Sequence, residues 1–205
     1  MSEPERYASP LGTRYASREM QELFGERRRI GLWRRLWVAL AEGERELGVP
    51  IPEAALDEMR AQVDDIDFAR AATYEGRFRH DVMAHVHTFG DAAPAARPYI
   101  HLGATSAYVA DNADLILARE ALRLLLARLG GVLRALLPFA ERWRALPTLA
   151  YTHLQPAQLT TVGKRATLWM QDFAQDVEEL QHRIGHLALL GCKGTTGTQA
   201  SFLTL

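Results

Sequence analysis

Apolar residues recur at helical spacing along most of the chain, and two of these runs are much longer than the others. The first alternates steps of three and four through Leu115, Ala118, Leu122, Leu125, Leu129, Val132 and Leu136. The second does so through Val162, Ala166, Trp169, Phe173, Val177, Leu180, Ile184 and Leu187. At about 1.5 Å per residue, each run predicts a helix roughly 40 to 50 Å long. Helices of that length are typical of a bundle.

The chain before these runs predicts shorter helices. An irregular arm extends to Thr13, after which Ser17 can cap a helix that runs towards Gly25. The next apolar run ends at Gly48, a typical helix-terminating residue. Three short helices follow around 53–63, 67–78 and 81–93. We therefore expect an all-α protein with a compact helical N-terminal domain over residues 1–105. Residues 106–205 form the first long helices of a central bundle domain, which is incomplete.

The first long run is apolar over more than one face. Six further residues widen its apolar seam, namely Ile116, Leu117, Leu124, Leu126, Leu133 and Leu137. A helix with such a wide apolar surface needs several partner helices to bury it. We expect some of these helices to come from other copies of the chain, so the sequence predicts a homo-oligomer.

Charge and composition exclude several classes of protein. The 205 residues have a net charge of −1 and a pI near 6.7, whereas nucleic-acid and membrane-surface binding depend on excess Lys and Arg. The local basic cluster of Arg27–Arg29, Arg34 and Arg35 is offset by nearby glutamates, which predicts a solvated helix face. Charged residues interrupt the most apolar stretch, residues 115–140, so no membrane span is predicted.

The single cysteine, Cys192, allows no intrachain disulfide. The opening segment Met1–Arg6 contains acidic residues and no apolar core, unlike a secretory signal. Both features are typical of a protein in a reducing compartment, and we expect a cytoplasmic location.

A segment dense in polar side chains, residues 151–165, lies at the start of the second long run. Within it, Pro156 disfavours helix just upstream, which predicts that His153 lies on a loop at a helix entrance. An imidazole is well suited to proton transfer near neutral pH. His153 is therefore a candidate general acid or base.

A similar polar segment, residues 100–112, precedes the first long run. Thr105 and Ser106 follow Gly103 and stand before the predicted helix. Hydroxyls and free backbone N–H groups at a helix N-terminus can bind a carboxylate. Simple N-capping explains the same two residues and remains the alternative.

Four residues, His80, Asp81, His85 and His87, could suggest a metal site. Only Asp81 and His85 have the i, i+4 spacing at which helical ligands converge. The stripe of Glu178, His182 and His186 is explained more simply as an exposed helix face. We predict no metal site.

Four strings of the sequence, at residues 80–89, 100–112, 151–165 and 193–202, resemble the adenylosuccinate lyase family of the fumarase and aspartase superfamily. The Thr-Ser pair and the Thr-His-x-Gln loop occur throughout that superfamily. The longer strings Gly-Ala-Thr-Ser, Gln-Pro-Ala-Gln-Leu-Thr-Thr-Val-Gly-Lys and His-Asp-Val-Met-Ala-His select its purine branch. The resemblance implies β-elimination of fumarate from adenylosuccinate and from succinylaminoimidazole-carboxamide ribotide in purine biosynthesis. It also implies a homotetramer that needs no cofactor.

The resemblance assigns roles to individual residues. His153 matches the catalytic general acid that protonates the departing nitrogen. Thr105 and Ser106 match the site of the succinyl carboxylate, and Arg14 and Tyr15 match the pair that meets the nucleotide phosphate and sugar. The implied substrate-binding residues are Arg14, Tyr15, Arg79, His80, Asp81, Thr105, Ser106 and Thr152.

The family's general base is a serine in a Ser-Ser-x-Met-Pro-x-Lys-x-Asn loop. This chain contains no Ser-Ser and no Met-Pro, so it resembles the first part of the enzyme, and we expect the isolated chain to be inactive. Two alternatives remain. The chain could belong to another fumarate-releasing lyase, of argininosuccinate or fumarase type, or it could serve as a non-catalytic helical oligomerisation scaffold.

Overall fold

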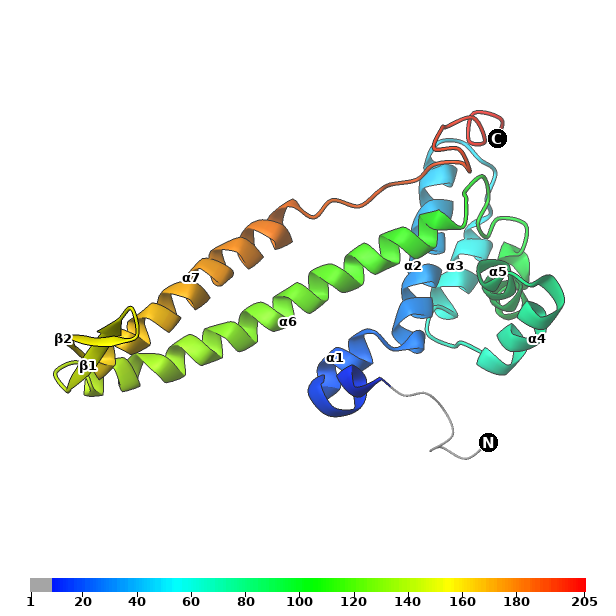
Figure 1. The fold of residues 1–205 in the computed structure, drawn as a ribbon. Coiled ribbons are helices and arrows are strands. Elements are labelled where there is room, and N and C mark those ends of the chain that lie inside the picture. The colour runs from blue at the N-terminus through cyan, green and yellow to red at the C-terminus, as the bar shows by residue number, and fades with distance from the viewer. Residues whose placement is uncertain (1–8) are drawn as a thin grey trace. The chain divides into compact units, whose positions relative to one another are not determined.

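The computed structural model describes residues 9–205 and divides the chain into two compact units (Figure 1). The first unit contains the chain up to Leu117 together with Ala188–Leu205, and the second contains Ala118–Leu187. The start of the predicted arm, including Met1–Arg6, lies outside the described residues. The elements are η2 (Leu11–Tyr15, a π-helical turn), α1 (Arg18–Leu23), α2 (Glu26–Glu46), α3 (Glu53–Ala61), α4 (Phe68–Phe78), α5 (Asp81–Ala92), η3 (Pro94–Ala96), α6 (Ala107–Arg142), β1 (Pro147–Thr152), β2 (Gln155–Thr161) and α7 (Val162–His186).

The predicted helices are confirmed, and local signals start and end them. The Ser17 hydroxyl caps α1 by accepting from the N–H of Met20, and Asp67 caps α4 by accepting from the N–H of Arg70. Helix α2 ends just before Gly48, whose φ of 104° lies in the left-handed region that favours glycine. Among the described residues, no helix is long and apolar enough to cross a membrane.

The core of the first unit forms around α2. Trp33 and Trp37 are completely buried and meet edge to face, with ring centroids 6.4 Å apart. Phe89 of α5 stacks on Trp37 at 6.1 Å. Val109 and Leu117, from the first turns of α6, belong to the same core. Burying each large side chain stabilises the fold by roughly 1.5 to 3 kcal/mol, so this cluster fixes α2, α5 and the start of α6 together.

The predicted solvated face on α2 is wrong at Arg34, which is fully buried, although Arg35 beside it is exposed and pairs with Asp64 at 2.8 Å. Arg34 Nη1 donates to the carbonyl oxygens of Gln62 and Asp65, at 2.5 and 2.6 Å. Its guanidinium also lies 4.6 Å from the ring centroid of Phe89. The loop after α3 exposes backbone carbonyls that need donors, and Arg34 supplies them. Burial lowers its pKa to about 10, so it stays charged at neutral pH.

In the second unit, α7 runs antiparallel to the later part of α6 (Figure 1). The Arg119 guanidinium donates to the carbonyl of Leu187 at one end, and the N–H of Gly163 donates to the carbonyl of Trp143 at the other, at 2.9 Å. A β1–β2 hairpin joins the two helices, in the region where the sequence predicted only a loop. Pro156 is compatible with β2 because a two-stranded sheet consists of edge strands, which tolerate a missing N–H.

Candidate active site

His153 and Leu154 form the tip of the β1–β2 hairpin. Both residues have positive φ, 49° and 61°, a conformation that hairpin turns usually give to Asn and Gly. Leu154 is fully exposed and His153 is exposed beside it. Bulky residues in the left-handed region are strained, and such strain concentrates at functional sites. The turn therefore presents the His153 imidazole to solvent from a backbone in the left-handed region.

The hairpin is anchored to the start of α7. Arg165 Nη2 donates to the carbonyl of Leu149 in β1 at 2.8 Å. Thr161, the last residue of β2, caps α7 by accepting from the N–H of Lys164 at 3.1 Å. Thr152 pairs with Gln155 next to the turn and is exposed. Thr152 and His153 thus lie together on one anchored element.

Three further predicted site residues, Arg79, His80 and Asp81, occupy the break between α4 and α5. Arg79 ends α4 with a φ of 55°, and His80 caps α5, with Nδ1 accepting from the N–H of Met83 at 3.4 Å. Asp81 Oδ1 lies 3.6 Å from His80 Nδ1. All three side chains are exposed. The break therefore presents a cation, an imidazole and a carboxylate in succession.

The structure adds His101, which the sequence analysis did not single out. Its Nδ1 accepts from Trp37 Nε1 at 3.0 Å, and its φ is 66°. Burial, and to a smaller extent the nearby His80, lowers its pKa to about 4. His101 is therefore neutral at pH 7 and carries its proton on Nε2, as a donor. The signal available in the sequence was its position inside the polar segment before α6.

Thr105 and Ser106 immediately precede α6, and their carbonyls accept from the N–H groups of Tyr108 and Val109 in its first turn. A pocket of about 200 Å³ lies at this helix start, and Thr105 shares its wall with Lys193 and Thr195. The Thr105 N–H also donates to the carbonyl of Lys193 at 3.4 Å. The Lys193-Gly-Thr-Thr-Gly string, which carried the family resemblance, thus lies beside Thr105 although no role was predicted for it.

The predicted residues fall into two groups. Arg14, Tyr15, Arg79, His80, Asp81, Thr105 and Ser106 belong to the first unit, and Thr152 and His153 belong to the second. Arg14 and Tyr15 lie on η2 with both side chains exposed. Within residues 9–205, His80 and Asp81 contact each other, and Thr152 and His153 are neighbours on the hairpin.

The two histidines of α5 lie in different environments. His85 is buried, edge to face with Trp33 at 5.8 Å, and burial lowers its pKa to about 4. His87 instead stacks on Phe78 with ring centroids 4.6 Å apart. Within residues 9–205, no group of three or more His, Cys, Asp or Glu side chains is arranged to hold a metal ion.

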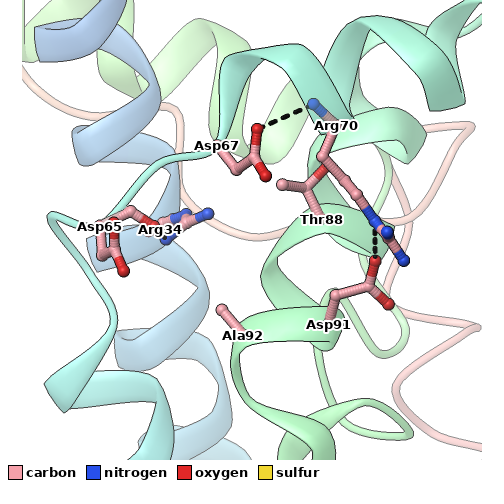
Figure 2. Close-up of a pocket in the computed structure, with 7 residues that line it drawn as sticks. All are labelled: Arg34, Asp65, Asp67, Arg70, Thr88, Asp91 and Ala92. Atoms are coloured by element: carbon pink, nitrogen blue, oxygen red, sulfur yellow. Dashed lines mark hydrogen bonds and ion pairs between the residues drawn. The ribbon is translucent and has the colours of Figure 1, made fainter.

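A pocket of about 400 Å³ beside α2 contains none of the predicted site residues (Figure 2). Figure 2 shows the Arg34 guanidinium extending from α2 towards Asp67 and Thr88. Arg70 Nε donates to Asp91 at 2.7 Å, while the Asp67 carboxylate accepts from the backbone N–H of Arg70. The Arg70–Asp91 pair joins α4 to α5, and Asp67 caps α4, so these charged groups have partners within the fold.

Comparison with known proteins places these residues in a wider context. The lyase family matches residues 18–203. The adenylosuccinate lyase of Saccharomyces cerevisiae is 49% identical over 208 residues, which cover 100% of this chain and 43% of the relative. The adenylosuccinate lyase of Schistosoma mansoni is 50% identical over 206 residues, with the same coverage. The chain thus spans less than half the length of these curated relatives.

Solved structures show the same similarity. A fumarate lyase from Mesorhizobium sp. BNC1 superposes with a TM-score of 0.82 and 29% identity, covering 91% of this chain and 44% of that protein. The 3-carboxy-cis,cis-muconate lactonizing enzyme of Pseudomonas putida gives a TM-score of 0.83 and 26% identity, covering 95% and 45%. The arrangement of elements described above is therefore shared with proteins of more than one named activity.

Proposed function

Because this chain belongs to the lyase family, we propose that it supplies part of the active site of an adenylosuccinate lyase. The reaction is β-elimination, which releases fumarate from adenylosuccinate and from succinylaminoimidazole-carboxamide ribotide in purine biosynthesis. The observation that carries the proposal is the exposed His153, held with positive φ on an anchored turn. The relatives named adenylosuccinate lyase, at 49% and 50% identity, support the choice of substrate.

In this reaction a base removes a proton from the succinyl β-carbon. The electron pair forms the new C=C bond as the C–N bond breaks, and His153 donates a proton to the departing nitrogen. The base is supplied by the complete enzyme, since the family's serine loop has no match in this chain. We therefore propose that the isolated chain does not catalyse the release of fumarate from adenylosuccinate.

The remaining predicted residues bind the substrate. The pocket at Thr105 suits the succinyl carboxylate, because Thr105, Thr195 and Lys193 line it at the start of α6, where the helix dipole favours an anion. Ser106 lies in the same helix start, and Thr152 stands beside His153. Arg14 and Tyr15 hold the nucleotide phosphate and sugar.

Arg79, His80 and Asp81 line the nucleotide end of the site. In the complete protein, residues 1–105 form the N-terminal helical domain and residues 106–205 begin the long-helix bundle. That protein is a cytoplasmic homotetramer that requires no cofactor and acts on small purine nucleotides.

The test joins this chain to the remaining part of the Saccharomyces relative and measures fumarate release by its absorbance. We expect turnover of adenylosuccinate that His153→Ala reduces roughly 10²- to 10⁴-fold, as for loss of a general acid. His182→Ala, which changes an exposed histidine of α7, is the matched control and should leave the rate unchanged.

Full turnover in the His153→Ala chimera would contradict the assigned role. Preferred turnover of argininosuccinate or of malate would identify another branch of the superfamily. A chimera that oligomerises but neither reacts nor binds adenosine monophosphate would identify a scaffold.

A further inference from the structure

Glu44 on α2 is a buried carboxyl group without a partner. The residue is 5% exposed, and neither side-chain oxygen has a hydrogen-bond partner. Its neighbours in sequence differ, because Glu42 accepts from Arg60 Nη2 at 2.7 Å and Glu46 is exposed. An unpaired carboxylate costs free energy when it is buried, so buried polar groups normally have partners. Glu44 therefore requires an explanation outside ordinary packing.

A cavity of about 300 Å³ in the first unit adjoins Glu44. Its walls are mainly apolar and include Leu40, Leu47 and Phe202. Tyr108 also lines it, but its hydroxyl already donates to the carbonyl of Leu36 at 2.8 Å. Apolar walls with a single free charged group are typical of a site for a small organic molecule.

We propose that this cavity binds a small organic cation, a primary ammonium on a short apolar stem, with Glu44 as its counter-ion. The ammonium offers three donors to a carboxylate that has no other donor, and the stem packs against Leu40, Leu47 and Phe202. A metal ion fits less well, since one carboxylate is far short of the oxygen ligands that hard cations require. None of the residues proposed for the lyase reaction lines this cavity, so the site is additional to that function.

Binding of the cation depends on the ionisation of Glu44. Burial raises the pKa of Glu44 to about 7. The titratable groups that line the cavity with it are Tyr108 of α6 and Cys192 of the segment after α7. Burial, together with the negative charge of Glu44, raises the pKa of the Cys192 thiol, and burial likewise raises that of Tyr108. Both stay neutral while Glu44 ionises, so ammonium affinity increases between about pH 6 and about pH 8.

Cys192 provides a direct readout, because it is the single cysteine of the chain and lines the cavity. The experiment measures the rate at which an aromatic disulfide reagent labels this thiol in the 205-residue chain, with n-butylammonium as the probe. We expect n-butylammonium to slow labelling in a saturable way. The neutral isostere n-butanol and the anion butyrate should protect the thiol at least about tenfold more weakly, which corresponds to about 1.4 kcal/mol.

Two variants and one control distinguish the effect of the Glu44 charge on binding from the effect of the cavity volume. Glu44→Gln keeps the shape and removes the charge, so protection by n-butylammonium should fall at least tenfold. Gly43→Leu keeps Glu44 but places a large side chain at the cavity wall, since Gly43 lines the cavity and a Cβ there meets nothing within 4 Å. It should abolish protection as well. Glu46→Gln, the same charge change at an exposed position, should behave as wild type.

Circular dichroism establishes whether each variant is folded. If Glu44→Gln unfolds, Gly43→Leu still tests whether the ligand binds in this cavity. Equal protection by n-butanol and n-butylammonium would overturn the proposal. Undiminished protection in folded Glu44→Gln, or in Gly43→Leu, would do the same.

Discussion

Asn112 of α6 hydrogen-bonds in both directions with Gly191, a residue 79 positions further along the chain. Asn112 Nδ2 donates to the Gly191 carbonyl at 3.0 Å, and Oδ1 accepts from the Gly191 N–H at 3.2 Å. The same carboxamide donates to the carbonyl of Tyr108 and accepts from the N–H of Leu190. With two donors and two accepted bonds its capacity is used completely. Asn112 thereby holds the segment that carries Lys193 at the start of α6.

We predict that Asn112→Ala releases this segment. The buried amide makes four hydrogen bonds, and at about 1 kcal/mol each their loss should lower the free energy of unfolding by roughly 2 to 4 kcal/mol. Hydrogen exchange at the amides of Leu190 and Gly191 should become faster. Asp111→Ala, at an exposed neighbour on α6, should leave both amides protected. Unchanged exchange in Asn112→Ala would show that other contacts hold the segment.

Gly163 and Gly185 of α7 should respond oppositely to the same substitution. A Cβ at Gly163 would lie 2.4 Å from the carbonyl oxygen of Ala140 and 2.7 Å from the Cα of Arg144, both backbone atoms. Gly163→Ala should therefore destabilise the second unit by about 2 to 3 kcal/mol.

At Gly185 a Cβ meets nothing within 4 Å, so Gly185→Ala should stabilise α7 by about 0.5 to 1 kcal/mol. Urea unfolding followed by circular dichroism measures both changes. Equal effects at the two positions would mean that Gly163 does not pack against the end of α6.

His85 should make the first unit less stable in acid. Its pKa is lowered from 6.5 to about 4 in the folded chain, so it favours the neutral form. This contribution to stability is complete above the pKa of the unfolded chain, 6.5. It is lost as the pH falls to the pKa of the folded chain, about 4. Between pH 7 and pH 4.5 the loss is roughly 2 kcal/mol.

Glu44 acts in the opposite sense, because its folded pKa is raised to about 7. Its contribution is present in acid and is lost as the pH rises. The two contributions therefore partly cancel in the pH dependence of the wild-type free energy of unfolding. Comparison with His85→Leu isolates the contribution of His85. The free energy of unfolding of wild type relative to His85→Leu should fall by roughly 2 kcal/mol over that pH range. A difference that stays constant with pH would refute the buried neutral imidazole.

Glu44→Gln should also increase the reactivity of Cys192 in the absence of any ligand. Burial is the main cause of the raised thiol pKa, and the negative charge of Glu44 is the second. Removing that charge lowers the thiol pKa and increases the thiolate fraction near pH 8. The initial rate of thiol labelling checks this, with Glu46→Gln as the charge-matched control. Identical rates in the two variants would show that the charge of Glu44 does not reach the thiol.

Helix positions follow from the sequence because their signals are local. The three-and-four spacing along α6 and α7, the Ser17 and Asp67 caps and the Gly48 terminator act within a few residues of the backbone that they shape. The strings around Thr105 and His153 could be recognised for the same reason, since each is continuous in the chain.

Burial and pairing depend instead on partners far away in the sequence, and only the tertiary structure decided them. Arg34 looked like part of a solvated face, but the carbonyl of Gln62, 28 residues away, requires its guanidinium inside the fold. Trp37 determines the tautomer of His101 across 64 residues. Periodicity also did not indicate the hairpin that forces His153 into positive φ. A sequence pattern records which face of a helix is apolar, whereas the cost of leaving a donor or acceptor unpaired is settled only when distant segments meet.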